Sequence, residues 1–327
     1  MGPGGASFAA GAAGEEAGVA AFEGKVGFVG LGGMGRGLVK NMLKRGVAVS
    51  VLDLDRAAVA KAVAQGAEAA DSIAELAADC DLLGLCVTTA EVVQGLALGA
   101  DGALACMRPG GILLDHTTTS PDHVDRMNAA CAEAGVAYAE APMTRTPMHA
   151  ERGEVNVLYG GEAELLARLQ PLFDCYAENV FHVGPAGHAI RLKLIHNYIA
   201  FANVASWCEG FALAAKEGLD MDKVIGIISA AGGRSGMMDL YGQKTLERDF
   251  APYMSLANAE KDLRYYRDWM SAAGLPPPLA EAVQQTFARA LEAGHGAEGC
   301  TAVIKAYEAA TGVEAALPKP PSDDPAT

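Results

Sequence analysis

The residues best suited to chemistry begin with three glycines spaced Gly-x-Gly-x-x-Gly, from Gly30 to Gly35. An apolar segment, 25–29, precedes them, and the run 36–45 that follows has the composition of a helix. In such a strand, turn and helix, the first glycine permits the turn and the second lets a pyrophosphate approach the backbone. The third lets the helix pack closely on the strand. The pattern predicts a dinucleotide site made by Gly30, Leu31, Gly32, Gly33, Met34 and Gly35.

An acidic residue follows at a spacing that discriminates between two dinucleotides. A second apolar segment, 47–52, ends in Asp53, eighteen positions after Gly35. A carboxylate near this spacing accepts hydrogen bonds from ribose hydroxyls and repels a 2′-phosphate. We therefore expect NAD as the cofactor and not NADP. The alternative is a glycine-rich turn followed by a surface aspartate.

A second group of polar residues stands in an otherwise apolar stretch. Lys193, His196 and Asn197 are at i, i+3 and i+4 of a predicted helix, so we expect them to share one face. Burying such groups is costly unless they have partners or a chemical role. Hydride transfer at a nicotinamide requires a proton to reach or leave the substrate oxygen, and a lysine can move it in both directions. We expect Lys193 to be this acid and base and Asn197 to orient the oxygen. The alternative is a lysine whose stem covers the core while its tip reaches water.

The elements that must position these residues alternate between strand and helix in the first half of the chain. Further strands are predicted at 81–87, 111–115, 136–140, 155–159 and 180–183, with helices such as 56–65, 121–134 and 162–172. Alternation of this kind builds a parallel sheet with helices on both faces. Ligands of such sheets lie outside the carboxyl ends of the strands. Those ends carry Val87, Thr88 and the run 115–119, which we expect near the cofactor.

The second half is predicted to be all helical. The first helix, 188–217, contains no proline and is mostly apolar, so it must be buried on several sides. Further helices are predicted at 221–230, 257–273, 278–293 and 300–311. The expected fold class is α/β: a Rossmann-type doubly wound parallel sheet, followed by an all-α domain joined through a long interdomain helix. The predicted domains are 24–186, which binds NAD, and 187–315, which serves substrate binding and oligomerisation.

Bulk properties exclude several functions. The chain has 327 residues, 51% of them hydrophobic, and a formal net charge of -15 without basic clusters. We therefore expect no nucleic-acid partner and no membrane partner, because both need Lys and Arg to meet anionic surfaces. Seven scattered cysteines without a C-x-x-C pair fit reduced thiols, and the histidines show no metal-ligand spacing. Residues 1–23 and 316–327 are predicted to be disordered, and the absence of a signal-peptide pattern indicates a cytoplasmic protein.

Four sequence blocks together resemble the β-hydroxyacid dehydrogenase family, of the 3-hydroxyisobutyrate dehydrogenase type, over 25–307. Gly30–Gly35 is similar to the family's cofactor fingerprint, and Asp115–Pro121 to its D-x-S-T-x-x-P block. Lys193–Asn197 is similar to its catalytic K-x-x-N-N, and Glu260–Leu263 to its late K-D-L block.

This resemblance implies a Rossmann domain joined by a long helix to an all-α domain that builds a homodimer or homotetramer. It also implies that Lys193 is the proton donor and acceptor. Lys261 would face both the nicotinamide and the substrate. Substrate contacts are implied for Thr117, Thr118 and Thr119, of which Thr118 would also meet the cofactor.

The family's substrate segment usually reads D-A-P-V-S-G-G, whereas this chain has Glu140-Ala141-Pro142-Met143-Thr144-Arg145-Thr146. An arginine can hold an anion by two parallel hydrogen bonds, so we expect Arg145 and Thr146 to bind the acidic group of the substrate. The segment resembles the G-R-T of sulfolactaldehyde reductases, with Thr144 in place of the glycine. The alternative is a surface arginine paired with a nearby acid such as Glu140 or Glu151.

His196 stands where the family has the first asparagine of K-x-x-N-N. The K-x-x-H-N form resembles 6-phosphogluconate dehydrogenases, but those chains are much longer and carry an NADP signature that Asp53 contradicts. We expect His196 to contact the substrate. The sequence thus favours an NAD-dependent oxidoreductase that interconverts a small anionic 3-hydroxy acid and its aldehyde acid. The alternatives are oxidative decarboxylation of a sugar acid and a catalytically silent NAD-binding scaffold.

Overall fold

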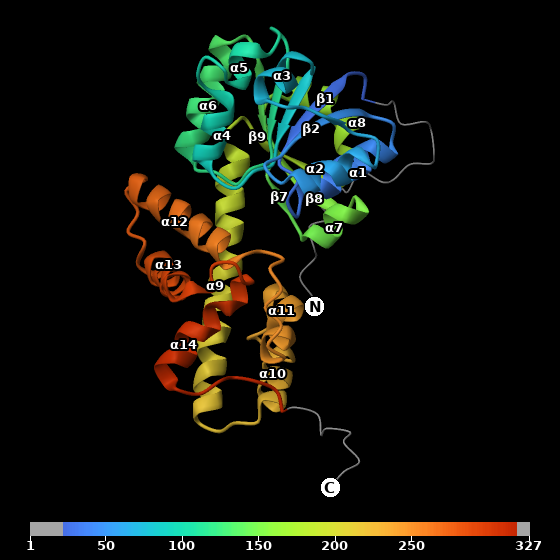
Figure 1. Cartoon of the computed structure of the whole chain (residues 1–327). Helices are drawn as coiled ribbons and strands as arrows, with labels where there is room; N and C mark the ends of the chain where they lie inside the picture. The colour runs from blue at the N-terminus through green and yellow to red at the C-terminus, as the bar shows by residue number, and fades with distance from the viewer. Residues whose placement is uncertain (1–21, 319–327) are drawn as a thin grey trace, which may run out of the picture. The chain divides into compact units, whose positions relative to one another are not determined.

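The computed structural model describes residues 22–318, which divide into two compact units within one long helix, between Lys193 and Leu194. We call residues 22–193 the sheet unit and residues 194–318 the helical unit (Figure 1). Apart from 22–23 and 316–318, the predicted disordered ends lie outside the described residues. The α/β fold class with an all-helical second part is confirmed.

The sheet unit contains one sheet of nine strands. They are β1 Lys25–Val29, β2 Ala48–Leu52, β3 Glu68–Ala69, β4 Leu82–Leu85, β5 Ile112–Asp115, β6 Ala137–Glu140, β7 Met143–Thr144, β8 Val155–Gly160 and β9 Ala177–Gly184. Their order is β3-β2-β1-β4-β5-β6-β8-β7, and β9 pairs with β8. The first six strands pair in parallel, as the alternating pattern predicts.

Beyond β6 the sheet becomes mixed. Strand β8 is antiparallel to both β6 and β7, whereas β9 runs parallel to β8. Only Ala141 and Pro142 separate β6 from β7. The registers Glu140↔Gly160 and Met143↔Val157 show that β7 continues the line of β6 along β8. The chain reverses only after β7, over residues 145–154, and Arg145 and Thr146 of the segment expected to bind substrate lie at the start of that connection.

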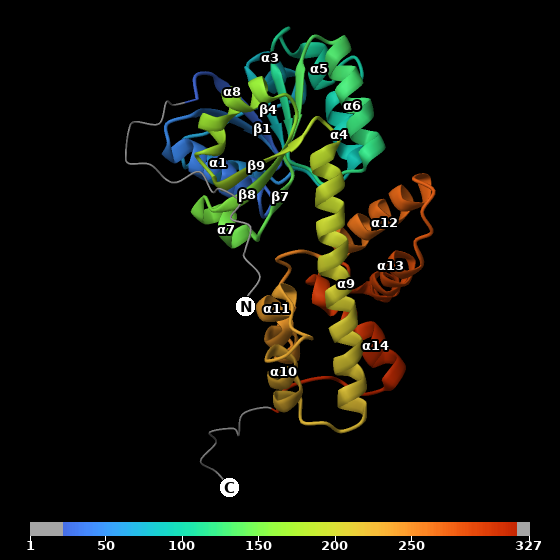
Figure 2. The ribbon, with the colours of Figure 1, turned by 180° about the vertical axis from the view of Figure 1, so that it is seen from behind.

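Helices cover both faces of the sheet. They are α1 Gly35–Lys44, α2 Arg56–Val63, α3 Ile73–Ala78, α4 Ala90–Ala97, α5 Ala103–Cys106, α6 Pro121–Glu133, α7 Pro147–Arg152 and α8 Ala163–Phe173. Phe28 of β1 packs in one core with Leu38 of α1 and Leu169 of α8. A Cβ on the preceding strand residue, Gly27, would lie 2.9 Å from Leu76 of α3, so α3 covers the opposite face. In both views α4 and α6 lie on one side of the sheet and α1 and α8 on the other (Figure 1, Figure 2).

The helical unit begins within α9 His188–Lys216. It continues with α10 Met221–Ser229, α11 Gly236–Leu246, α12 Leu256–Ala272, α13 Pro278–Ala290, a π-helical turn Leu291–His295, a 3₁₀ turn Cys300–Val303 and α14 Ile304–Thr311. Its core is built on α9, where Phe201, Val204 and Phe211 are buried against α12 and α13.

Two predicted helices of this unit differ in detail. The helix expected over 278–293 ends at Ala290, and Gly294 in the π-helical turn has a positive φ of 93° that no regular helix allows. The helix expected over 300–311 begins as a 3₁₀ turn and becomes α-helical at Ile304. Helix α11 was not predicted, because Gly236 and a weak apolar period hid it; Ser235 caps it by accepting a hydrogen bond from Met238 N.

Candidate functional site

The glycine turn that joins β1 to α1 has no room for side chains at the first and third glycines of the Gly-x-Gly-x-x-Gly motif. Gly30 has a φ of +98°, and a Cβ there would lie 2.2 Å from the carbonyl oxygen of Cys86. A Cβ on Gly35 would lie 1.9 Å from the Gly30 carbonyl oxygen. These two positions require glycine for the turn and for helix packing, as the spacing predicts.

The middle glycine differs, because its surroundings in the protein do not demand glycine. A Cβ on Gly32 would meet no atom of the described residues within 4 Å. It would instead fill exposed space beside the start of α1. The side chain of the N-cap residue, Met34, makes no capping hydrogen bond to α1, and the first turn of α1 has no acidic residue. The next three helices differ, because Asp55, Ser72 and Thr89 cap α2, α3 and α4. An uncapped N-terminus beside a glycine cradle suits the pyrophosphate of a dinucleotide.

Asp53 follows β2 directly and lies beside the glycine turn. Its Oδ2 accepts a hydrogen bond from Leu31 N at 2.5 Å, and its Oδ1 accepts one from Asp55 N at 2.7 Å. The carboxylate therefore fixes the turn as well as marking the end of the strand. Each carboxylate oxygen can accept a further hydrogen bond, so ribose hydroxyls can still be bound there.

The ends of β4 and β5 are tied together through a threonine. The hydroxyl of Thr117 accepts a hydrogen bond from Val87 N at 3.2 Å, and Thr117 N donates to Asp115 at 2.8 Å. Thr118 is half-buried and Thr88 is exposed. Thr119 is fully buried, and its hydroxyl has no hydrogen-bond partner within 22–318. The structure thus gathers the predicted threonines at the carboxyl edge of the sheet.

Arg145 follows β7 in the left-handed backbone region, with a φ of +79°. Its Nη1 donates to the carbonyl oxygen of Glu154 and to the carboxylate of Glu178. The ion-pair partners suggested by the sequence were wrong. Glu140 binds α9 instead, and Glu151 pairs with Arg36 and Lys40. The arrangement of the strands determines the partner of Arg145, because β8 and β9 bring Glu178 beside the turn.

The same segment lies beside the glycine turn. Thr146 begins α7, sharing a capping box with His149. A Cβ on Gly33 would lie 3.2 Å from the ring of Pro147, and one on Gly37 would lie 2.5 Å from the Ala150 backbone. The predicted substrate segment and the predicted cofactor turn therefore belong to one edge of the sheet unit.

Lys193 and Asn197 lie one turn apart on α9, and both are buried, with 9% and 5% of their surface exposed. His196 is exposed, so of the three residues expected to share one face only Lys193 and Asn197 are buried. Positions i+3 and i+4 are 100° apart around a helix, and the buried stripe of α9 follows the i+4 positions. His196 instead hydrogen-bonds Asn197 through Nδ1 and Oδ1 at 2.9 Å.

Asn197 is held by a residue to which the sequence assigned no role. Its Nδ2 donates to Asp262 of α12 at 2.6 Å, and Lys261 Nζ lies 3.2 Å from the other oxygen of the same carboxylate. Lys261 and Asp262 are 7% and 2% exposed. The helical unit therefore joins the two predicted residues through Asp262. That residue was visible in the K-D-L block, and an acid directly after a buried lysine was the signal that could have identified it.

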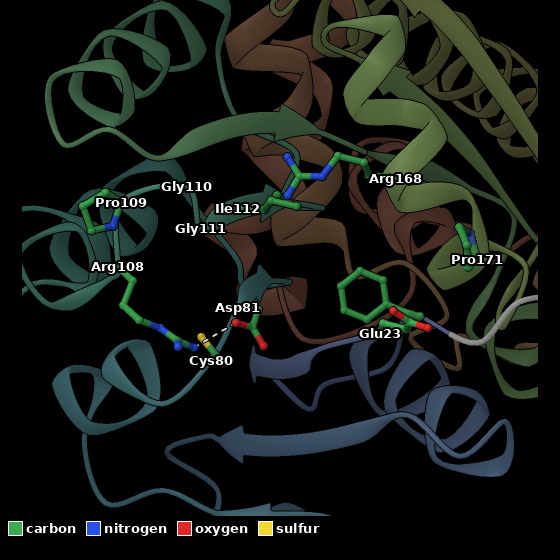
Figure 3. A pocket seen from close by; sticks show the side chains of 11 residues that line it. Glu23, Cys80, Asp81, Arg108, Pro109, Gly110, Gly111, Ile112, Arg168 and Pro171 are labelled. Atoms are coloured by element: carbon green, nitrogen blue, oxygen red, sulfur yellow. Dashed lines mark hydrogen bonds and ion pairs between the residues drawn. The ribbon is translucent and has the colours of Figure 1, made fainter.

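A separate pocket of about 500 Å³ lies at the opposite end of the sheet, against the amino ends of β4 and β5 (Figure 3). An ion pair of 2.8 Å joins Arg108 to Asp81 there. None of the predicted site residues lines it. Among the described residues no cluster of His, Cys, Asp or Glu could hold a metal ion. No described helix is long and apolar enough to cross a membrane.

Comparisons with known proteins match nearly the whole described chain. Residues 25–184 match the family described as the NAD binding domain of 6-phosphogluconate dehydrogenase. Residues 186–307 match the family described as NAD-binding of NADP-dependent 3-hydroxyisobutyrate dehydrogenase.

Individual relatives extend over the same length. The chain is 32% identical to 2-(hydroxymethyl)glutarate dehydrogenase of Eubacterium barkeri, over 88% of this chain and 96% of the relative. It is 27% identical to 3-sulfolactaldehyde reductase of Escherichia coli strain K12, over 89% and 98%. A crystal structure of 3-hydroxyisobutyrate dehydrogenase from Salmonella typhimurium matches with a TM-score of 0.78 and 32% identity, over 86% and 99%.

Proposed function

The chain belongs to the β-hydroxyacid dehydrogenase family, of the 3-hydroxyisobutyrate dehydrogenase type, and from this membership we propose that it interconverts a small anionic 3-hydroxy acid and its aldehyde acid with NAD. As a member it is an NAD(P)-dependent oxidoreductase of small hydroxy acids. The names of the relatives support the finer substrate class, since 2-(hydroxymethyl)glutarate and 3-sulfolactaldehyde each combine an anionic group with a terminal hydroxymethyl or aldehyde carbon.

The proposed proton carrier is Lys193. When bound, the nicotinamide accepts or supplies the hydride. Lys193 removes the hydroxyl proton during oxidation and returns it during reduction, so a single residue serves both directions. Asn197 orients the oxygen, and Asp262 fixes the amide of Asn197 by accepting its hydrogen bond. The single observation that supports this reading most is that Lys193 and Asn197 are both buried, one turn apart on α9.

The test replaces Lys193 with Met, which keeps the length and apolar character of the stem but removes the ammonium. Turnover should fall by roughly 10²–10⁴, the usual contribution of a positioned proton carrier. NADH affinity, measured by fluorescence titration, should remain. The matched control is Lys216→Met, at the exposed far end of the same helix. Unchanged turnover in Lys193→Met would refute the assignment, and tight NADH binding by the unaltered protein without turnover would favour the scaffold alternative.

For the substrate, we propose that Arg145 and Thr146, with Thr117 to Thr119, hold the acidic group. In support, the segment of Arg145 lies beside the glycine turn. A screen of short aldehyde acids for NADH oxidation tests the class, and it should include tartronate semialdehyde, succinate semialdehyde, methylmalonate semialdehyde and sulfolactaldehyde. Release of carbon dioxide together with NADH formation would instead indicate oxidative decarboxylation.

A further inference from the structure

A buried carboxylate of the sheet accepts hydrogen bonds from the start of α9. Glu140, the last residue of β6, is 2% exposed. Its Oε1 accepts a hydrogen bond from Ala189 N at 2.9 Å, and its Oε2 accepts one from Ile190 N at 3.0 Å. All of these residues belong to the sheet unit. One side chain therefore binds two successive backbone N–H groups of the first turn of α9.

The surrounding residues are arranged for this contact. Gly187, just before α9, has no side chain that could cap the helix, so the N–H groups of the first turn need acceptors from elsewhere. Gly160 of β8 pairs with Glu140 in the sheet, and a Cβ on Gly160 would lie 2.2 Å from Glu140 Oε1. A negative group at a helix N-terminus is also favoured by the helix dipole. Glu140 thus acts as the cap of α9 from a distant part of the sequence.

We propose that Glu140 is a positioning residue for Lys193, which it orients by anchoring the first turn of α9 to the end of β6. Lys193 follows Ala189 by four residues, about one helical turn. The anchor therefore fixes the backbone that carries the ammonium relative to the carboxyl edge of the sheet. The proposal rests on the proposed function of Lys193. A misplacement of about 1 Å can cost roughly 10²-fold in rate, so a loose first turn should slow turnover.

The charge of Glu140 sets the strength of this anchor. Burial, with a smaller contribution from Asp115 of β5, raises its pKa to about 7, although the backbone N–H groups oppose the shift. Tyr138 of β6 also interacts with Glu140, and the first two turns of α9 carry His188 and Arg191, of which Arg191 pairs with Asp125. Protonation places a hydrogen on one carboxyl oxygen, which weakens one of the two hydrogen bonds to α9. The two hydrogen bonds to α9 favour the ionised carboxylate, so losing them while Glu140 stays buried would raise its pKa further. Protonation therefore favours release of the first turn, and the anchor should loosen as the pH falls below 7.

The test compares Glu140→Gln with Glu133→Gln, which removes one negative charge from an exposed position on α6. The glutamine carbonyl can accept one N–H, but its amide group cannot accept the other. In Glu140→Gln we expect kcat to fall tenfold or more, NADH affinity to stay within about twofold, and hydrogen exchange in 187–193 to increase. The acid limb of the kcat profile near pH 7 should disappear. Glu133→Gln should match the unaltered protein in all four.

Unchanged kcat or unchanged exchange in 187–193 of a folded Glu140→Gln would overturn the proposal. If that variant does not fold, exchange of 187–193 in the unaltered protein, corrected for intrinsic rate, is compared at pH 8 and pH 6. Faster exchange at pH 6 supports the anchor, and equal exchange overturns it. The two hypotheses fail separately: retained turnover in Lys193→Met removes the proposed function, whereas lost turnover there with full turnover in Glu140→Gln removes only the positioning role.

Discussion

Individual residues of the site carry more than one task. Asp53 both fixes the glycine turn through Leu31 and stands where the cofactor ribose is expected. Asp262 connects Asn197 to Lys261, and Glu140 connects β6 to α9. In each case a carboxylate with two oxygens joins two elements. Substitutions at this scale should therefore keep the shape of the side chain and change only its charge.

Asp53→Asn should relax the proposed preference for NAD. The amide keeps an acceptor for Leu31 N but no longer repels a 2′-phosphate. We expect the ratio of kcat/KM for NAD to that for NADP to fall roughly tenfold or more, since like charges in contact cost several kcal/mol. Asp55→Asn is the control, because Asp55 only caps α2. An unaltered protein that uses both dinucleotides equally would contradict the assignment of NAD.

Arg145→Ala should raise KM for anionic substrates more than it lowers kcat. Its guanidinium has five donors, and the two hydrogen bonds to Glu154 and Glu178 both use Nη1. The other donors suit a carboxylate or sulfonate. Glu178→Gln is the matched control, because it removes the ion pair and leaves the arginine. If Arg145→Ala leaves KM unaltered for every acid in the screen, the arginine is a structural residue of the β7 turn.

At the scale of elements, the site depends on how strands and helices approach each other at the carboxyl edge of the sheet. The glycine turn brings α1 within van der Waals distance of β1, and α7 packs on α1 through Gly37 and Ala150. The anchor between β6 and α9 is made at the same end of the strands. Backbone contacts this close leave no tolerance for an added methyl group.

Two Gly→Ala substitutions should therefore have opposite effects. Gly35→Ala places a Cβ 1.9 Å from the Gly30 carbonyl oxygen, so it should abolish NADH binding and lower the unfolding temperature. Gly95→Ala lies within α4, where a Cβ would meet no described atom within 4 Å. It should stabilise the protein by about 0.4–1 kcal/mol. Thermal unfolding measures the stability of each variant, and fluorescence titration measures its affinity for NADH. Equal effects of Gly35→Ala and Gly95→Ala on these two quantities would show that the glycine turn is not tightly packed.

At the scale of the whole molecule, stability depends on buried ionisable groups in the sheet unit. His116 is 3% exposed; its Nδ1 lies 2.8 Å from the Ala141 carbonyl oxygen and its Nε2 lies 3.2 Å from the Tyr176 hydroxyl. The carbonyl can only accept, so Nδ1 carries the proton and Nε2 accepts from Tyr176. Burial lowers the pKa of His116 to about 4, and burial likewise lowers the pKa of His123 to about 4. Both histidines are neutral in the folded protein at pH 7.

The protein should consequently lose stability in mild acid. A depressed histidine pKa gives stability that is present above the unfolded value near 6.5 and is lost as the pH falls toward 4. For His116 the loss is on the order of 3 kcal/mol. Denaturant unfolding between pH 7 and pH 4 measures it, and His116→Asn should show a shallower dependence. In global unfolding Glu140 acts in the opposite direction, because unfolding exposes its buried carboxyl to water and the raised pKa then favours the folded state below pH 7. If the free energy of unfolding depends on pH with the same slope in His116→Asn and in the unaltered protein, the assignment of His116 as a buried neutral group is contradicted.

The sequence alone determined the fold class, the glycine turn and helix α9, because each follows from local spacing. Glycines at fixed intervals, apolar runs that end in polar residues and a long apolar helix need no distant partner to be recognised. Tertiary structure decided the rest. The pairing of Arg145 with Glu178 depends on the order of strands at the sheet edge. The exposure of His196 depends on which stripe of α9 is buried. The hydrogen bonds of Glu140 to Ala189 and of Asp262 to Asn197 join residues 49 and 65 positions apart. Contacts at such separations are set by packing, which no local pattern encodes.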